Sequence, residues 1–264
     1  GFIDVYITPD RVHAFLPQNK ILRILFGTFV GFIFPSCECG IVPIVNRFLE
    51  KKVPTYTAVP FLATAPVINP IVLFATYTAF GNSVRFALFR ALGSILVALV
   101  LGIFWGFVVK EPILKKDGKK DHLHDFSDKQ GWTKVGYALI QAIDEFFDMG
   151  RYLVFGCLFA SFVQVYVPTY VLTRIGHNSL TAILLMMVLA FLLSLCSEAD
   201  AFIGASLLAS FGFAPVMAFL IIGPMIDIKN LLMMKNHFTN KFILQFISLI
   251  TLVILAYSLM IGGF

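Results

Sequence analysis

The chain has 264 residues, of which 59% are hydrophobic and only 13% are charged, and its formal net charge is +5. Soluble proteins carry roughly 25% charged residues, so this composition excludes a soluble enzyme, a disordered chain and a disulfide-rich secreted domain. The positive charge is expected in cytoplasmic loops. Nucleic-acid binding is not expected, because there is no basic face with interleaved aromatic residues.

Stretches without Asp, Glu, Lys or Arg mark the expected membrane segments. In chain order they are residues 24–37, 53–84, 91–109, 152–173, 175–197, 201–226 and 242–264. About 20 apolar residues span the hydrocarbon core of a bilayer, so the first stretch reaches across only with its flanking residues. The continuous apolar runs predict helices, and the fold class is an all-α, polytopic membrane protein.

A polar segment divides these stretches into two groups. It begins at Lys110 and contains a dense run of basic residues up to Lys120. We therefore expect a first transmembrane repeat over residues 1–109, a polar cytoplasmic linker over residues 110–131 and a second transmembrane repeat over residues 132–264.

The repeat rests on short matches between the two halves, which occur in the same order and at a nearly constant offset. The matches are Val5-Tyr6 with Val165-Tyr166, Glu38 with Glu198, and Ala65-Pro66-Val-Ile-Asn69 with Gly223-Pro224-Met-Ile-Asp227. The pattern predicts two structural repeats, either parallel or inverted. Because residues 2–6 match the end of a helix at 162–166, roughly 25–35 further residues with most of one span are expected before Gly1.

Glycine and proline fall at corresponding places in the two halves and predict broken or re-entrant helices. The candidate breaks are Gly40, Pro43, Pro66 and Pro70, and then Gly204, Gly212, Pro215, Gly223 and Pro224. We expect a short or re-entrant piece near residues 38–50 and 198–212, and a helix entered or kinked near 66–70 and 224–228. Secondary transporters often bind their substrates at such breaks.

Two carboxylates at repeat-related positions are the first candidates for function. Glu38 and Glu198 each follow a cysteine within two residues. A carboxylate at the centre of a membrane costs about 2.5–3.5 kcal/mol on insertion scales, which favours a substrate or proton site. The alternative is that both residues only cap helix N-termini near the interface.

Three cysteines lie beside these carboxylates. Thiolates bind soft metals and metalloids, whereas a buried cysteine also packs as a small hydrophobic residue. If the repeats meet, a metal site is formed by Cys37, Glu38, Cys39, Cys196 and Glu198.

A second polar group follows the proline breaks. Asn69 and Asp227 each lie three residues after a proline, and their oxygens together with freed backbone carbonyls suit a cation or a substrate. Lys229 is expected to pair with Asp227 or Asp200, which would lower the energy of burying both charges. The alternative is an ordinary kink whose polar groups satisfy the local backbone.

Motifs of soluble enzymes are missing from the sequence. There is no nucleotide-binding loop, no Gly-x-Ser-x-Gly and no His-Glu-x-x-His. We therefore expect neither an enzyme nor a bound cofactor.

The segments Pro35-Ser-Cys-Glu-Cys-Gly-Ile-Val-Pro43 and Ala65-Pro66-Val-Ile-Asn69-Pro70 resemble the ArsP/YraQ family of predicted bacterial permeases. The resemblance covers essentially the whole chain and implies a polytopic inner-membrane permease in which Cys37, Cys39 and Pro66–Pro70 act in transport. Members of the family include exporters of trivalent organoarsenicals. The commoner family pattern has Ser in place of Glu38, and the acidic second motif is similar to the YcgR-type branch.

Together these observations predict a permease of the bacterial inner membrane that moves a metal, a metalloid or another small inorganic solute. The expected pathway residues are Cys37, Glu38, Cys39, Pro66, Asn69, Pro70, Cys196, Glu198, Asp200, Pro224, Asp227 and Lys229. One alternative is efflux of organoarsenicals by cysteine contact. Another is a non-transporting subunit of a larger complex, with a second membrane or accessory protein as its partner.

Overall fold

The computed structural model describes residues 17–33, 37–109, 113–114 and 179–263, and single positions at 143, 147, 150, 154 and 158. The predictions for residues 1–16, for most of the linker at 110–131 and for most of the run at 152–173 lie outside the described residues. Within the described ranges the regular elements are helices, and pairing of the strand type is limited to one bridge between Leu114 and Phe238.

The first half contains five α-helices and a short π-helical end in its described part. The helices are α3 (Lys20–Ile33), α4 (Glu38–Glu50), α5 (Thr55–Thr64), α6 (Pro70–Ala79) and α7 (Val84–Ile103), which continues into η1 (Phe104–Val108).

The described part of the second half contains five α-helices. They are α10 (Ser179–Leu193), α11 (Ser197–Phe211), α12 (Phe213–Met225), α13 (Ile228–His237) and α14 (Asn240–Gly262).

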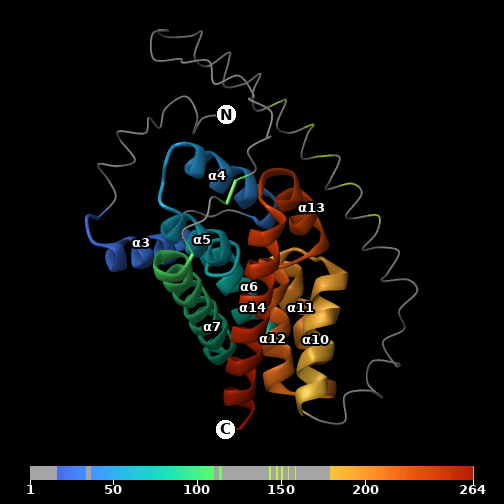
Figure 1. Ribbon diagram of the computed structural model, residues 1–264. Helices are drawn as coiled ribbons and strands as arrows, with labels where there is room; N and C mark the ends of the chain where they lie inside the picture. Colours follow the sequence, from blue (N-terminus) through green and yellow to red (C-terminus); the bar gives the residue numbers. More distant parts are fainter. Residues whose placement is uncertain are drawn as a thin grey trace.

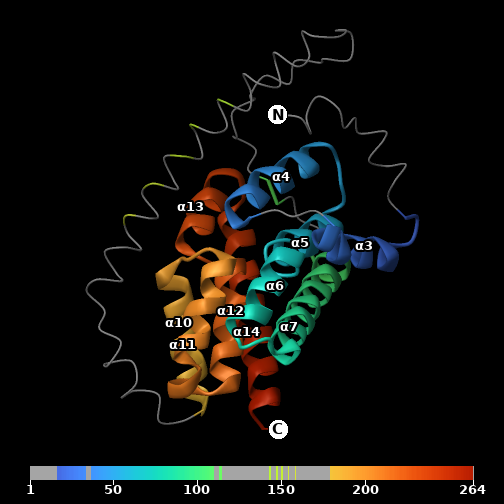
Figure 2. The same cartoon turned by 180° about the vertical axis from the view of Figure 1, so that it is seen from behind.

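Helix α12 is the centre of the packed structure. Every residue from Ala214 to Met225 is buried, as expected for a helix that is hydrophobic on all sides. It packs against α10, α11 and α14, and also against α5 and α7 from the first half. Figures 1 and 2 show α10, α11, α12 and α14 side by side, with α4 and α13 at one end of this group.

Helix α3 lies across the direction of α7 and α14 (Figure 1) and packs on α5 and α7. Two glycines one turn apart allow this close contact. A Cβ atom on Gly27 would lie 2.2 Å from the carbonyl oxygen of Thr57, and one on Gly31 would lie 2.7 Å from the Cα atom of Ala65. Small residues at a four-residue spacing are a common way for membrane helices to approach each other.

Three helical stretches in the described residues are long and apolar enough to cross a membrane. They are Val84–Val108, Phe213–His237 and Asn240–Gly262. The run at 53–84 is divided at the predicted break near residues 66–70 into α5 and α6, each 10 residues long. At 1.5 Å per residue, neither helix alone crosses a hydrocarbon core of about 30 Å. The described part of α3 has 14 residues and is also too short.

The main predicted interruptions are confirmed. The chain leaves the helix between Thr64 and Pro70, and again at residues 226–227 between α12 and α13. Gly212, with a φ of +80°, separates α11 from α12. This left-handed conformation is one that glycine adopts without steric cost.

Other candidate breaks are wrong. Gly40 and Pro43 lie inside α4, and Gly204 lies inside α11 without interrupting it. Pro215 is in the first turn of α12, where backbone N–H groups have no partner within the helix, so the missing N–H of proline removes no hydrogen bond.

Candidate functional site

The helices α4 and α11 begin in the same way. Their N-cap residues are Cys37 and Cys196, both extended, with φ and ψ of −77° and 163° in one and −73° and 149° in the other. Counted from these caps, Glu38 corresponds to Ser197. The predicted pairing of Glu38 with Glu198 aligns the acidic residues, whereas the helix starts align Glu38 with the residue before Glu198.

The first residues of α4 and α11 meet in the interior. The hydroxyl group of Ser197 donates a hydrogen bond to Oε1 of Glu38 at 2.5 Å, across 159 residues of sequence. Both side chains are buried. The Glu38 carboxyl also lies within electrostatic range of Asp227 and Lys229, so residues from both halves of the chain share one buried environment.

Asn69 and Asp227 are the N-cap residues of α6 and α13, the helices that follow the two breaks. Oδ1 of Asn69 accepts a hydrogen bond from the backbone N–H of Ile71 at the start of α6. Oδ1 of Asp227 accepts one from the backbone N–H of Asn230 at the start of α13. Both residues therefore satisfy local backbone groups, which was one of the two predicted alternatives.

Asp227 also has partners beyond its own helix. Its Oδ2 accepts a hydrogen bond of 2.9 Å from the hydroxyl of Ser194 and lies 3.6 Å from Nζ of Lys229. Ser194 lies in the turn before α11 with a φ of +48°. Lys229 is buried beside its partner, so of the two predicted partners it forms the ion pair with Asp227.

A buried arginine was missed by the sequence analysis. Arg90 lies in α7 and is 0% exposed. Its Nη1 donates to Oγ1 of Thr76 in α6 at 2.7 Å, and its Nη2 donates to the carbonyl of Ser197 at 3.2 Å. Its position inside the long apolar run of α7 is the feature that could have identified it, because a charge in a membrane segment is costly and is commonly functional.

Asp200 completes this group. It lies one turn into α11 and is 1% exposed, facing Gly223 of α12. A Cβ atom on Gly223 would lie 2.5 Å from Oδ2 of Asp200, so the carboxyl group fits only because residue 223 has no side chain. We use the name buried polar cluster for this set, which consists of Glu38, Arg90, Ser197, Asp200, Asp227 and Lys229.

The predicted sulfur ligands are at the edge of the buried polar cluster. Cys37 and Cys196 are free and exposed, while the side chain of Cys39 lies outside the described residues. Glu198 is half-buried and lies within electrostatic range of Arg90. Among the described side chains, no three His, Cys, Asp or Glu residues are close enough to hold a metal ion. The five-residue metal site therefore stays a prediction.

The predicted prolines mark the breaks themselves. Pro66 lies in the turn after α5, and Pro70 is the first residue of α6. Pro224 lies in the last turn of α12. Proline at a first helical position loses no hydrogen bond, whereas Pro224 lacks the N–H that the carbonyl of Leu220 would otherwise accept.

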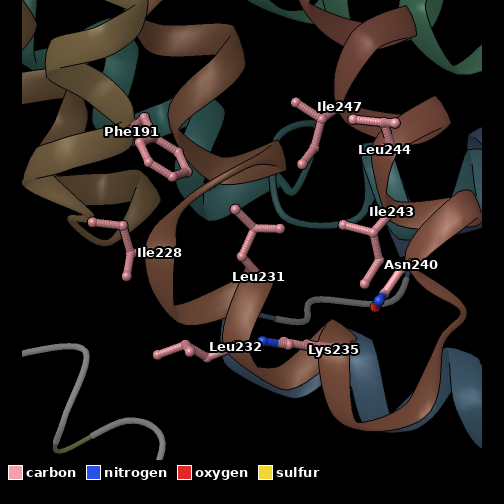
Figure 3. Close-up of a pocket in the computed structure, with 9 residues that line it drawn as sticks. All are labelled: Phe191, Ile228, Leu231, Leu232, Lys235, Asn240, Ile243, Leu244 and Ile247. Atoms are coloured by element: carbon pink, nitrogen blue, oxygen red, sulfur yellow. The ribbon is translucent and has the colours of Figure 1, made fainter.

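A cavity of about 430 Å³ lies elsewhere, between α10, α13 and α14. Figure 3 shows its lining, which is apolar except for Lys235 and Asn240. Its lining contains no member of the buried polar cluster and no carboxylate. The cavity therefore adds no acidic ligand to the buried polar cluster.

The arrangement of broken helices with buried charges at their ends is typical of transport proteins. Comparison with family models gives a match over residues 1–263 to ArsP_1, which is described as a predicted permease. The chain belongs to this family. With its apolar helices, this ArsP-family chain is a membrane protein, and its family points to a permease.

Two relatives extend this assignment. The chain is 68% identical to a protein of Streptococcus mutans serotype c named "Putative two-component membrane permease complex subunit", over 99% of this chain and 87% of that protein. It is 43% identical to "UPF0718 protein YcgR" of Bacillus subtilis, over 100% of this chain and 89% of that protein. The second relative supports the YcgR-like branch. No solved structure matches this chain.

Proposed function

We propose that this protein is the solute-moving subunit of a bacterial inner-membrane permease. Its substrate is a metal, a metalloid or another small inorganic solute, which passes the buried polar cluster between the two halves of the chain. The observation that carries this proposal is the hydrogen bond between Ser197 and Glu38, because it joins the starts of α4 and α11 in a buried, charged environment.

The edge of the buried polar cluster suits such a substrate. Cys37 and Cys196 are exposed at the two helix starts, and Glu198 is half-buried beside them. Thiols bind soft ions and carboxylates bind harder ones. A solute that reaches this edge would thus meet sulfur and oxygen ligands before it meets the buried charges.

The test is transport by variants that lose these carboxylates but keep their shape. Glu38→Gln retains an oxygen that can accept from Ser197, so membrane insertion and folding should be preserved. Transport should be lost in Glu38→Gln and in Glu198→Gln. The transported solute is first found by comparing the growth of cells with and without the protein on a panel of zinc, cadmium, arsenite and methylarsenite.

The matched control is Glu50→Gln. Glu50 lies at the far end of α4, where it forms an exposed ion pair of 3.1 Å with Arg47, and its loss should leave transport unchanged. Wild-type transport by the double variant Glu38→Gln with Glu198→Gln would contradict the proposal.

Organoarsenical efflux by cysteine contact is the second candidate. It is favoured by the exposure of Cys37 and Cys196, since a trivalent arsenical needs accessible thiols. Cells that express the protein should then tolerate methylarsenite better, and Cys37→Ser should remove this tolerance. Tolerance that survives the loss of Cys37 and Cys196 together would exclude this mechanism.

The relative from Streptococcus mutans is named as a complex subunit, and we extend that to this chain. A second membrane protein is expected to accompany it in the bilayer. Purification of the tagged chain from its native membrane should recover a stoichiometric partner, and recovery of the chain by itself with full transport would contradict this expectation.

A further inference from the structure

Asp200 differs from the other buried carboxyl groups because it has no partner. Among the described residues, Oδ1 and Oδ2 of Asp200 accept no hydrogen bond although both are buried. Glu38 accepts from Ser197, and Asp227 accepts from Ser194. A buried ionised carboxylate without a partner is far less stable than a paired one. A buried Asp200 must therefore be neutralised, either by a proton on the carboxyl group or by a bound cation.

The charged groups around Asp200 do not supply this cation. Arg90 is within electrostatic range, but its two Nη atoms donate to Thr76 and to the carbonyl of Ser197, and its Nε, which has no acceptor among the described residues, forms no hydrogen bond with Asp200. Lys229 is paired with Asp227. In the buried polar cluster, three carboxyl groups therefore stand against two cations, so one further positive charge would balance it. Glu38 is one of these three carboxyl groups, and Glu198, half-buried outside the cluster, supplies no positive charge.

The backbone of α12 approaches Asp200 at Gly223, close to the end of the helix. The carboxyl group lies against the backbone at Gly223, since a Cβ atom there would be 2.5 Å from Oδ2. Helix α12 ends two residues later, at Met225, and carbonyl groups in a last turn have no donor within the helix. In the described chain no backbone N–H outside α12 donates to the carbonyls of Gly223, Pro224 or Met225.

The unpartnered carboxyl group, the excess of negative charge and the end of α12 all favour a bound cation. The C-terminal end of a helix carries partial negative charge, which repels an ionised carboxylate and attracts a cation. Carboxylate and carbonyl oxygens are the ligands that hard cations prefer, and broken helices in transporters hold Na⁺ with such carbonyl groups. The single missing positive charge indicates a monovalent ion.

We propose that Asp200 and the C-terminal carbonyl groups of α12 form a binding site for Na⁺. The ion neutralises Asp200 and joins α11 to the broken end of α12. Because this end leads directly into Asp227 and α13, occupancy of the site affects how the two helices meet at the break. The use of this ion to drive transport rests on the proposed function, whereas its binding does not.

The experiment measures binding of ²²Na⁺ to the purified full-length chain in lipid nanodiscs, with choline chloride replacing NaCl to keep ionic strength constant. We expect saturable binding of one ion per chain and a rise in melting temperature with Na⁺ concentration. Asp200→Asn should lose both effects. Glu50→Gln, which removes an exposed carboxylate of α4, should retain both.

Two further measurements keep the test decisive. If Asp200→Asn does not fold, Gly223→Ala displaces the carboxyl group from the backbone of α12 and should also abolish binding. Absence of saturable ²²Na⁺ binding to the wild-type chain would overturn the proposal without any variant. A melting temperature that rises at low pH but does not change with Na⁺ concentration would overturn it as well. Glu198→Gln separates the two proposals, because it should lose transport and still bind Na⁺.

Discussion

Replacement of Arg90 by methionine tests how far the stability of the chain depends on its fully buried arginine. The guanidinium group is fully buried and joins α7 to Thr76 in α6 and to Ser197 at the start of α11. Methionine retains much of the side-chain volume but none of the donors. The variant therefore removes two interhelical hydrogen bonds and one buried positive charge without opening a large cavity.

The expected loss follows from these contacts. Interhelical hydrogen bonds in membranes contribute about 0.6–1.7 kcal/mol each, so two of them contribute about 1–3 kcal/mol. The variant also removes one of the two cations that interact with Glu38 and Asp200, and Lys229 is the other. Removing one partner of a buried ion pair costs about 3–5 kcal/mol. Because Arg90 touches neither carboxylate directly, we expect a loss near the lower limit, about 3 kcal/mol.

The assay is reversible unfolding in mixed micelles, followed by the fluorescence of Trp105, which is buried against Phe242. Arg90→Lys should lose less than Arg90→Met, since it keeps the charge but not the two-pronged donor geometry. The matched control is Arg85→Met in the same helix. Arg85 is exposed and lies 4.6 Å from the ring of Phe213, a contact that contributes about 0.5–1 kcal/mol.

A loss in Arg90→Met no larger than that in Arg85→Met would refute the reasoning. It would mean that the buried carboxyl groups do not depend on this cation and that its two hydrogen bonds are replaced in the variant. A loss of stability with no change in transport would confine Arg90 to a structural role.

Three smaller predictions use the same unfolding assay. Gly27→Val should destabilise the chain by about 1–3 kcal/mol through overpacking, because a Cβ atom at residue 27 would lie 2.2 Å from a backbone oxygen of α5. Gly106→Ala should be neutral, because the nearest atom to a Cβ atom there is 3.5 Å away. Asp227→Ala should cost about 3 kcal/mol by leaving Lys229 buried without its carboxylate, and Asp227→Asn should cost less because it can still cap α13. Tyr257→Phe removes a 2.8 Å hydrogen bond to a carbonyl of α7 and should cost about 1 kcal/mol; a neutral result would show that water replaces this bond.

Much of the fold could be predicted because it depends on local properties. The scarcity of charge predicts membrane helices, and the prolines at 66, 70 and 224 predict where helices break. These effects act within a few residues of the chain. Lengths were less predictable: the prolines at 66 and 70 mark a break inside the apolar run at 53–84, but they do not show that the helices on either side are only 10 residues long.

The candidate site was predicted in part. Glu38, Asp227 and Lys229 were identified as buried charges, and they share one environment. Arg90 was missed because a single arginine ends a run that is defined by the absence of charge. Ser197 was missed because a serine in a membrane segment is ordinary. Both matter only through contacts with residues more than 100 positions away or in another helix.

The sequence by itself determined that this is a helical membrane protein with interrupted helices and unusual charges near the interruptions, because hydropathy and backbone restrictions are local. Only the tertiary structure decided which charges are satisfied. It paired Lys229 with Asp227 rather than Asp200, and it placed Asp200 against the end of α12 with no donor. Whether a buried group has a partner depends on the packing of helices that are distant in sequence. The residues on either side of the buried group do not determine that packing.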